Sequence, residues 1–194
     1  MSKQPENLEP IVFVGVDVSK ERLDVCVLPG GELHEFANDP KGQASLVHCL
    51  KQLPKVAVVI ESTGGYERPA LFAMQDADLH VTLVNPRQVR DFAKGIGQLA
   101  KTDRIDAAVL AEFARLVAPP PTDKTSEKQR ELDALVTRRR QLLETRVAER
   151  NRIGLTNDKF VQKTFQRILK VIDREIETIE DRIARLLESD DQWK

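Results

Sequence analysis

The stretch I-V-F-V-G-V-D-V-S-K at residues 11–20 decides how the first part of the chain folds. It carries no charge before Asp17, and a Val-rich apolar run of this kind is typical of a strand buried on both faces and central in its sheet. Because side chains alternate along a strand, Phe13, Gly15 and Asp17 share one face and the even-numbered valines the other. Gly15 is expected to leave open space beside Asp17. A carboxylate there is costly unless it is paired, hydrogen-bonded or metal-bound, so we expect a metal ligand or catalytic acid. The alternative is a turn or capping residue at the strand end.

The sequence after this strand predicts a mixed α/β sheet. An alternating segment follows after a short connection, a Pro-Gly-Gly turn leads to a third strand, and Asp39-Pro40 has the form of a helix start. Strands are expected at 23–28, 32–36, 55–60 and 79–84, and helices at 40–53, 66–77, after Asn85-Pro86 and at 103–117. Three strands, a helix and then alternating strands and helices is the order of a mixed α/β sheet, and it also occurs in the ribonuclease-H-like fold.

Three consecutive prolines at residues 119–121 predict a domain boundary, because they cannot continue a helix and favour an extended spacer. Beyond them the chain has no proline and only one glycine, Gly154, and is rich in Arg, Glu, Leu and Ile. We therefore expect a polar tail at residues 1–10, an α/β domain at 11–118, a Pro-rich linker at 119–125 and a coiled-coil helical hairpin at 126–190.

Apolar spacing in the second expected helix of the hairpin is typical of a coiled coil. Its apolar seam steps mostly by four and three, with one irregular step from Ile172 to Ile176. A hairpin with exposed apolar seams needs a partner, so we expect a homo-oligomer, either a dimer or a tetramer. The predicted seam consists of Val161, Phe165, Ile168, Ile172, Ile176, Ile179, Ile183 and Leu186.

Composition excludes some classes of protein. The formal net charge of -1 over 194 residues does not indicate a general nucleic-acid binder, so any basic surface must be local. Cys26 and Cys49 lie in apolar contexts without zinc-ligand spacing, and we interpret them as reduced core residues. The polar first ten residues do not resemble a signal peptide, and no apolar run is long enough to span a membrane. We predict a cytoplasmic protein with no membrane partner.

Four acidic residues are candidates for one metal site. Glu61 closes a predicted strand and can lie beside Asp17 at the same end of the sheet. Asp103 and Asp106 are three positions apart and therefore project from the same side of a helix. Four carboxylates make an oxygen-rich site suited to Mg²⁺ or Mn²⁺, and two such ions can clamp the attacking and leaving oxygens of a phosphodiester. Taken singly, Asp103 and Asp106 are equally explained as acids at a helix N-terminus or in its solvated first turn.

Basic residues flank this acidic group and predict contacts with phosphates. Gly95 and Gly97 allow the loop between them to approach a nucleic-acid backbone closely. Such contacts position a duplex but carry no sequence information. Arg138 and Arg139 in the expected hairpin could extend the contact, or could belong to a solvated face mixed with Glu. The predicted nucleic-acid-binding residues are Lys20, Arg87, Arg90, Lys94, Lys101, Arg104, Arg138 and Arg139.

Four blocks of the chain resemble the signature blocks of the DEDD transposases of bacterial insertion sequences, which are also known as bridge-RNA-guided recombinases. The blocks are G-V-D-V-S-K, E-S-T-G-G-Y, V-N-P-R-Q-V-R-D-F-A and K-T-D-R-I-D-A-A-V-L-A, in the family's order. The resemblance implies a RuvC-like domain whose catalytic and metal-binding acids are Asp17, Glu61, Asp103 and Asp106. It also implies DNA and a guide RNA as partners, and a coiled coil that joins subunits.

One departure from the family pattern concerns the nucleophile. Members of the family continue into a second domain, which carries the serine that attacks DNA, and no serine in this sequence matches it. We therefore expect an N-terminal part of such a protein, which binds Mg²⁺ and structured RNA but forms no covalent DNA adduct. Ser19 and Ser62 lie near the acidic residues and are interpreted as loop residues, and Tyr66 as a packing aromatic.

Two other functions are compatible with parts of the sequence. The first is a non-catalytic, oligomerising protein that binds RNA. The second is an actin-like or sugar-kinase-type ATP-binding domain, because G-V-D-V-S-K followed by an alternating strand also resembles the first phosphate-binding hairpin of those proteins. Their fold needs a second Asp-bearing strand, whereas only helices are expected after Pro121.

Overall fold

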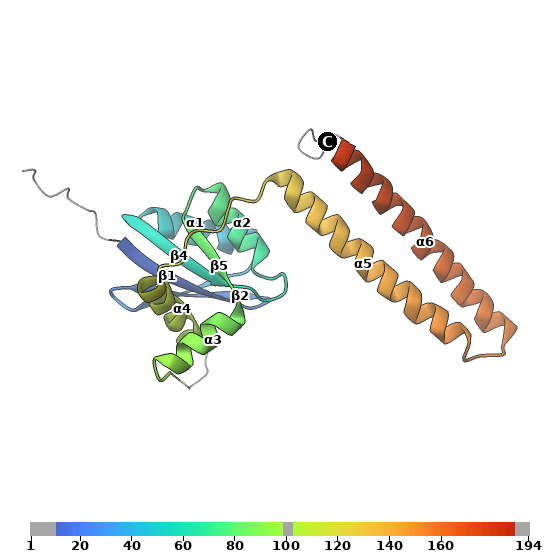
Figure 1. Cartoon of the computed structure of the whole chain (residues 1–194), viewed down its shortest axis with the longest axis horizontal. Coiled ribbons are helices and arrows are strands. Elements are labelled where there is room, and N and C mark those ends of the chain that lie inside the picture. Colours follow the sequence, from blue (N-terminus) through green and yellow to red (C-terminus); the bar gives the residue numbers. More distant parts are fainter. Residues whose placement is uncertain (1–10, 99–102, 189–194) are drawn as a thin grey trace, which may run out of the picture. The chain divides into compact units, whose positions relative to one another are not determined.

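The structure is a computed structural model and describes residues 11–98 and 103–188. The described residues divide into two compact units, and the division falls after Lys124. We call the first the sheet unit and the second the hairpin unit (Figure 1). In the described ranges, no helix is both long and apolar enough to cross a membrane.

The sheet unit contains the predicted mixed sheet. Its strands are β1 (Ile11–Val18), β2 (Arg22–Leu28), β3 (Glu32–Ala37), β4 (Lys55–Glu61) and β5 (Val81–Val84). They lie side by side in the order β3-β2-β1-β4-β5. β1, β4 and β5 are parallel, and β2 is antiparallel to both of its neighbours. The Val-rich strand β1 is therefore central, as its sequence predicts, and the predicted ribonuclease-H-like mixed α/β fold is confirmed.

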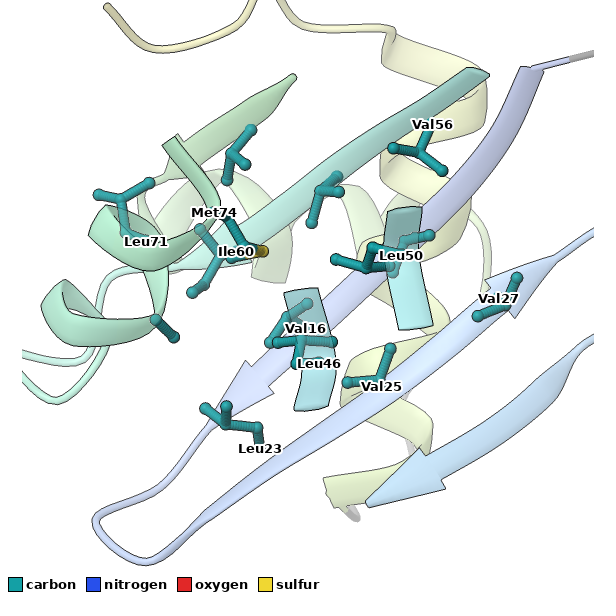
Figure 2. Packing of buried hydrophobic residues seen from close by; sticks show 14 of the residues in the cluster. Val16, Leu23, Val25, Val27, Leu46, Leu50, Val56, Ile60, Leu71 and Met74 are labelled. Atoms are coloured by element: carbon teal, nitrogen blue, oxygen red, sulfur yellow. The ribbon is translucent and has the colours of Figure 1, made fainter. Parts of the chain in front are cut away.

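Helices cover both faces of this sheet. α1 (Pro40–Lys51) and α2 (Arg68–Asp76) pack on the face that carries the even-numbered valines of β1. There Val16 is fully buried in one cluster with Leu46, Leu50 and Met74 (Figure 2). α3 (Pro86–Gly95) and α4 (Asp103–Val117) pack on the opposite face, where Phe92 meets Phe113 edge to face at 5.2 Å. Asp17 lies on this second face because it alternates with Val16 and Val18.

Gly15 is where α4 comes closest to the sheet. A Cβ atom on Gly15 would lie 2.1 Å from the carbonyl oxygen of Ala107 and 2.3 Å from the backbone nitrogen of Ala111. The prediction of open space beside Asp17 is therefore wrong, because the helix backbone fills the space that the missing side chain leaves. The glycine fixes how near the helix can approach β1.

Residues 119–124, which we call the strap, lie along the free edge of β5. The Thr122 N–H donates to the carbonyl of Val81 at 2.9 Å, and the Leu83 N–H donates to the Thr122 hydroxyl at 2.9 Å. The Thr82 hydroxyl donates to the carbonyl of Pro120 at 3.0 Å. Lys124 then forms an ion pair with Asp78 at 2.9 Å. The predicted linker is therefore hydrogen-bonded to the sheet edge through Pro120 and Thr122.

The hairpin unit consists of α5 (Glu127–Ile153) and α6 (Lys159–Glu188). Ser126 caps α5 by accepting from the Gln129 N–H at 3.1 Å, and Asp158 caps α6 by accepting from the Phe160 and Val161 N–H groups at 2.8 and 3.0 Å. Ion pairs join Arg139 to Glu180 and Glu131 to Arg182. These pairs match early positions of α5 with late positions of α6, so the two helices are antiparallel.

The inner face of α6 differs from the predicted seam at two positions, because Val161 is 37% exposed and is not among the inner residues, and Leu169 takes the place of Ile168. Leu169 is half-buried, whereas Ile168 is 47% exposed. With Leu169 in place of Ile168, the step from Ile172 to Ile176 is no longer irregular, because the spacing alternates four and three throughout. The inner residues are Phe165, Leu169, Ile172, Ile176, Ile179, Ile183 and Leu186.

Candidate active site

Asp17 and Glu61 lie side by side at the carboxyl ends of two neighbouring parallel strands. Val16 of β1 is in register with Ile60 of β4, and the two acids are the next residue on each strand. Both are half-buried. Neighbouring residues in register point to the same face, so both carboxylates lie on the face that α4 covers. This register agrees with the prediction that Glu61 lies beside Asp17 at the same end of the sheet.

The first turn of α4 lies toward the same end of the sheet. Gly15 meets Ala107 and Leu110 of α4, whereas Phe13, earlier on β1, packs with the cluster that contains Phe113. The helix therefore runs antiparallel to β1, and its beginning lies toward Asp17. Asp106, half-buried, immediately precedes Ala107. Asp103 is the first residue of α4, and its side chain lies outside the described part, so its position in the site stays a prediction.

The chemistry of these residues fits a hard divalent cation. Mg²⁺ and Mn²⁺ prefer carboxylate oxygens, which Asp17, Glu61 and Asp106 supply from two strands and a helix. Among the side chains that the structure describes, no group of three or more His, Cys, Asp or Glu residues is arranged to hold a metal ion. The side chain of Asp103 falls outside that search. Metal binding by the four acids therefore stays a prediction.

A buried acid that the sequence motifs do not predict as a site residue, Asp24, lies beside the site. It faces Asp17 across the β1–β2 pair and is only 7% exposed. The Nε atom of Arg22 donates to it at 2.8 Å, and Arg22 also lies 3.7 Å from Glu35 on β3. The alternation in L-D-V-C-V-L could have found it, because the residues that alternate with Leu23 and Val25 face α4. Arg22 balances one negative charge next to Asp17.

Glu67 organises the loop that follows Glu61. Its carboxylate is 4% exposed and accepts from the Thr63 N–H, the Thr63 hydroxyl and the Gly65 N–H at 2.8–3.0 Å. Burial opposes ionisation of Glu67, but these hydrogen bonds outweigh it and lower the pKa of the carboxyl group. Gly64 and Gly65 have φ of +80° and +131°, backbone angles that residues other than glycine rarely adopt. The loop is thus closed around a buried anion.

Asn38 ties this loop to the turn after Asp17. Its amide nitrogen donates to the carbonyls of Ser19 at 2.9 Å and Tyr66 at 3.0 Å. The Tyr66 side chain is 51% exposed, so the interpretation of Tyr66 as a packing aromatic is wrong. The Ser19 hydroxyl donates to the carbonyl of Arg22 and accepts from its N–H, both at 3.0 Å, which supports a turn role. The two loops that follow the strand acids are therefore linked.

The predicted basic residues have different surroundings. Arg87, Arg90 and Lys94 are exposed along one side of α3, and Lys20 is exposed in the β1–β2 turn. Lys94 lies 3.6 Å from Asp91. Lys101 and the side chain of Arg104 lie outside the described residues.

In the hairpin unit, the two predicted arginines are already engaged within the chain. Arg139 pairs with Glu180 at 2.6 Å, and Arg138 donates to the Gln141 side chain at 3.3 Å. This engagement weakens the case for Arg138 and Arg139 as phosphate ligands. Cys26 and Cys49 are free thiols, and burial, with the nearby charge of Glu112, raises the pKa of Cys26.

Comparisons with known proteins agree with the blocks in the sequence. The model of the IS110-type DEDD family, described as "Transposase", matches residues 14–156. The pilin gene-inverting protein of Moraxella lacunata is 28% identical over 147 residues, which cover 72% of this chain and 45% of that protein. The transposase for insertion sequence element IS1111A of Coxiella burnetii is 23% identical over 192 residues, or 95% of this chain and 51% of that protein. The chain thus spans about half the length of these curated relatives. A T. thermophilus RuvC solved with a Holliday junction substrate aligns with 57% of this chain and 99% of its own at 20% identity and a TM-score of 0.42.

Proposed function

This chain belongs to the IS110-type DEDD transposase family, and from that premise we propose that its sheet unit carries a metal-dependent site for DNA strand cleavage and rejoining. The observation that carries the proposal is the register of β1 and β4, which makes Asp17 and Glu61 neighbours at one end of the sheet. The first turn of α4, with Asp103 and Asp106, lies toward the same end.

The four acids would hold Mg²⁺ or Mn²⁺, which when bound polarises a phosphate and stabilises charge on its oxygens. The contribution of the chain is to position the ligands before the metal arrives. Asp17 and Glu61 are fixed by strand pairing, and the approach of α4 is fixed by Gly15. Three exposed cations on α3, the helix that directly follows β5, would hold phosphates of the nucleic acid. They are Arg87, Arg90 and Lys94.

Asp24 would act as a positioning residue. Its carboxylate lies opposite Asp17 but is held by Arg22. The Arg22–Asp24 pair supplies no net charge to the site, so the charge that attracts a cation comes from the four predicted ligands. A variant of Asp24 should therefore change metal affinity less than a variant of Asp17 does.

The finer parts of the proposal follow the family resemblance. DNA is the substrate, a structured guide RNA selects the target, and subunits associate through the hairpin unit. Support for association comes from apolar side chains of α6 that α5 leaves exposed, since Val161, Ile168 and Val171 are 37%, 47% and 61% exposed. Exposed apolar groups that recur along a helix are typical of a surface that another protein chain covers.

Direct measurement of metal binding tests the site. Titration with Mn²⁺, followed by electron paramagnetic resonance, should detect one or two bound ions per chain. Asp17→Asn, Glu61→Gln, Asp103→Asn and Asp106→Asn should each weaken binding by about ten-fold or more, since each removes a charged ligand without changing its size. Glu32→Gln, an exposed carboxylate at the start of β3, serves as the matched control.

Two results would count against the proposal. Equal Mn²⁺ affinity in the four ligand variants and the control would remove the metal site. A chain that binds structured RNA tightly but binds no divalent cation would instead support the non-catalytic RNA-binding function.

A further inference from the structure

The two ends of the hairpin unit differ in charge. Residues 145–170, which surround the turn between α5 and α6, contain seven Lys or Arg residues and two acidic residues, Glu149 and Asp158. The rest of the hairpin, residues 126–144 and 171–188, contains eight basic and ten acidic residues. The turn end is therefore a local basic surface on a chain whose formal net charge is -1.

Three arginines of α5 pair with carboxylates of the hairpin itself. Arg146 lies 3.3 Å from Asp173, Arg139 lies 2.6 Å from Glu180, and Arg152 pairs with Glu149. Lys163, Arg167 and Lys170 on α6 differ, because none of them takes part in an ion pair of the described residues. All three are exposed. Their charges are therefore available to a ligand.

These three cations line a shallow depression together with Phe160 and Gln166. The depression has a volume of about 290 Å³, and Phe160 is 73% exposed. Lys163 and Lys170 are seven residues apart, so the cations extend over about 10 Å along the helix. The inner residues of α6 occupy the opposite side of the helix, so this face is not used to pack against α5.

We propose that this face of α6 binds a single-stranded segment of DNA, with phosphates on Lys163, Arg167 and Lys170 and an unpaired base stacked on Phe160. Exposed aromatic rings beside cations form the usual platform for single strands, because every base has a face that can stack. A duplex keeps its bases paired and cannot use the ring. The proposal rests on the proposed function, in which strand cleavage and rejoining separate the strands of the DNA.

Fluorescence anisotropy with a labelled oligothymidylate tests the surface on the whole chain. The variant in which Lys163, Arg167 and Lys170 are all replaced by Gln should bind at least about ten-fold more weakly, and its salt dependence should fall by about two in the log–log slope. The charge-matched control replaces Lys41, Arg140 and Arg185, all exposed, by Gln and should keep most of the affinity. Far-ultraviolet circular dichroism checks that both variants remain helical.

Stacking is tested separately by Phe160→Ala. It should weaken binding of the single strand by at least about five-fold and leave binding of a duplex of equal length unchanged. With 2-aminopurine in the oligonucleotide, the wild-type chain should quench its fluorescence and the variant should not.

Several outcomes would overturn the inference. The first is that the charge-matched control weakens binding of the oligothymidylate as much as the triple variant does. The second is equal affinity of the chain for a duplex and for a single strand. The others are binding of the matching RNA that is at least ten-fold tighter, and complete displacement of the oligothymidylate by polyglutamate. None of them involves Asp17 or Glu61, so this surface can fail while the metal site stands. Loss of Mn²⁺ binding in the ligand variants with unchanged DNA binding would in turn separate the site from the surface.

Discussion

The sheet unit and the hairpin unit differ in how their helices are held. In the sheet unit, helices on both faces press onto a valine-rich sheet, and Val16, Ile60 and Met74 have no exposed surface. In the hairpin unit, the buried apolar side chains of the described residues are Leu142, Ile172 and Ile176, each still 5–7% exposed. Surface ion pairs supplement them, and each such pair contributes only about 0–1 kcal/mol. The candidate acids thus lie in the part of the chain with the larger core, which suits a site whose ligands must be held in place.

Replacement of Gly15 by Val should be the most damaging change to the sheet unit. The new side chain would meet the backbone of Ala107 and Ala111, which cannot move without displacing α4, so we expect a loss of more than about 4 kcal/mol or a failure to fold. Urea unfolding measures the loss, and hydrogen exchange should show protection lost in β1 and α4 but kept in α5 and α6. Gly30→Ala is the control, because its Cβ would meet only the Glu32 side chain at 3.4–3.7 Å. An unchanged unfolding midpoint for Gly15→Val would refute the close approach of α4.

In the hairpin unit, the effects of Ile176→Asp and Val171→Asp on stability should distinguish a buried apolar residue of α6 from an exposed one. Ile176 is 5% exposed and faces α5, so an acid there should cost about 3–4 kcal/mol and separate the helices. Val171 is 61% exposed, and its replacement should change hairpin stability by less than about 0.5 kcal/mol. Light scattering should show a smaller mass for Val171→Asp if subunits associate through the exposed apolar side chains of α6. Equal destabilisation by both variants would contradict the assignment of the two faces.

Glu67→Gln should destabilise the chain less than Gly15→Val or Ile176→Asp does, by about 1–3 kcal/mol. The pKa of Glu67 is lowered from its ordinary value of 4.5, so its contribution is present above that value and is lost as the pH falls through the lowered one. The wild-type chain should therefore lose stability on acidification below about 4.5, and the variant should lose less over the same range. Urea midpoints at neutral and acidic pH measure this difference, with Glu21→Gln, an exposed acid, as control. The same acid sensitivity in Glu67→Gln would exclude Glu67 as its source.

Much of the sheet could be predicted because its signals are local. The strand β1 and the N-caps Asp39 and Asn85 depend on a few adjacent residues, and periodicity placed α4 at residues 103–117. The neighbouring positions of Asp17 and Glu61 could also be predicted, because parallel strands of one sheet bring their carboxyl ends together.

Other features could not be predicted because their partners are distant in the sequence. Nothing near Gly15 indicates that a helix almost one hundred residues later fills its side-chain space. Asp24 looks like one acid in an alternating strand until Asp17 is placed opposite it. The sequence predicts that Ile168 faces α5 in place of Leu169 because both residues fit an apolar spacing along α6. Only the packing against α5 distinguishes them.

The strap has a practical consequence for shortened versions of the protein. β5 is an edge strand, and unpaired N–H and C=O groups on such an edge recruit strands of other molecules. Thr122 uses its backbone and its hydroxyl to occupy the groups of Val81 and Leu83 that would otherwise be open. A version that ends at Val117 would contain every residue of the candidate metal site and still tend to aggregate. The useful end of the sheet unit is therefore Lys124, seven residues beyond its last helix.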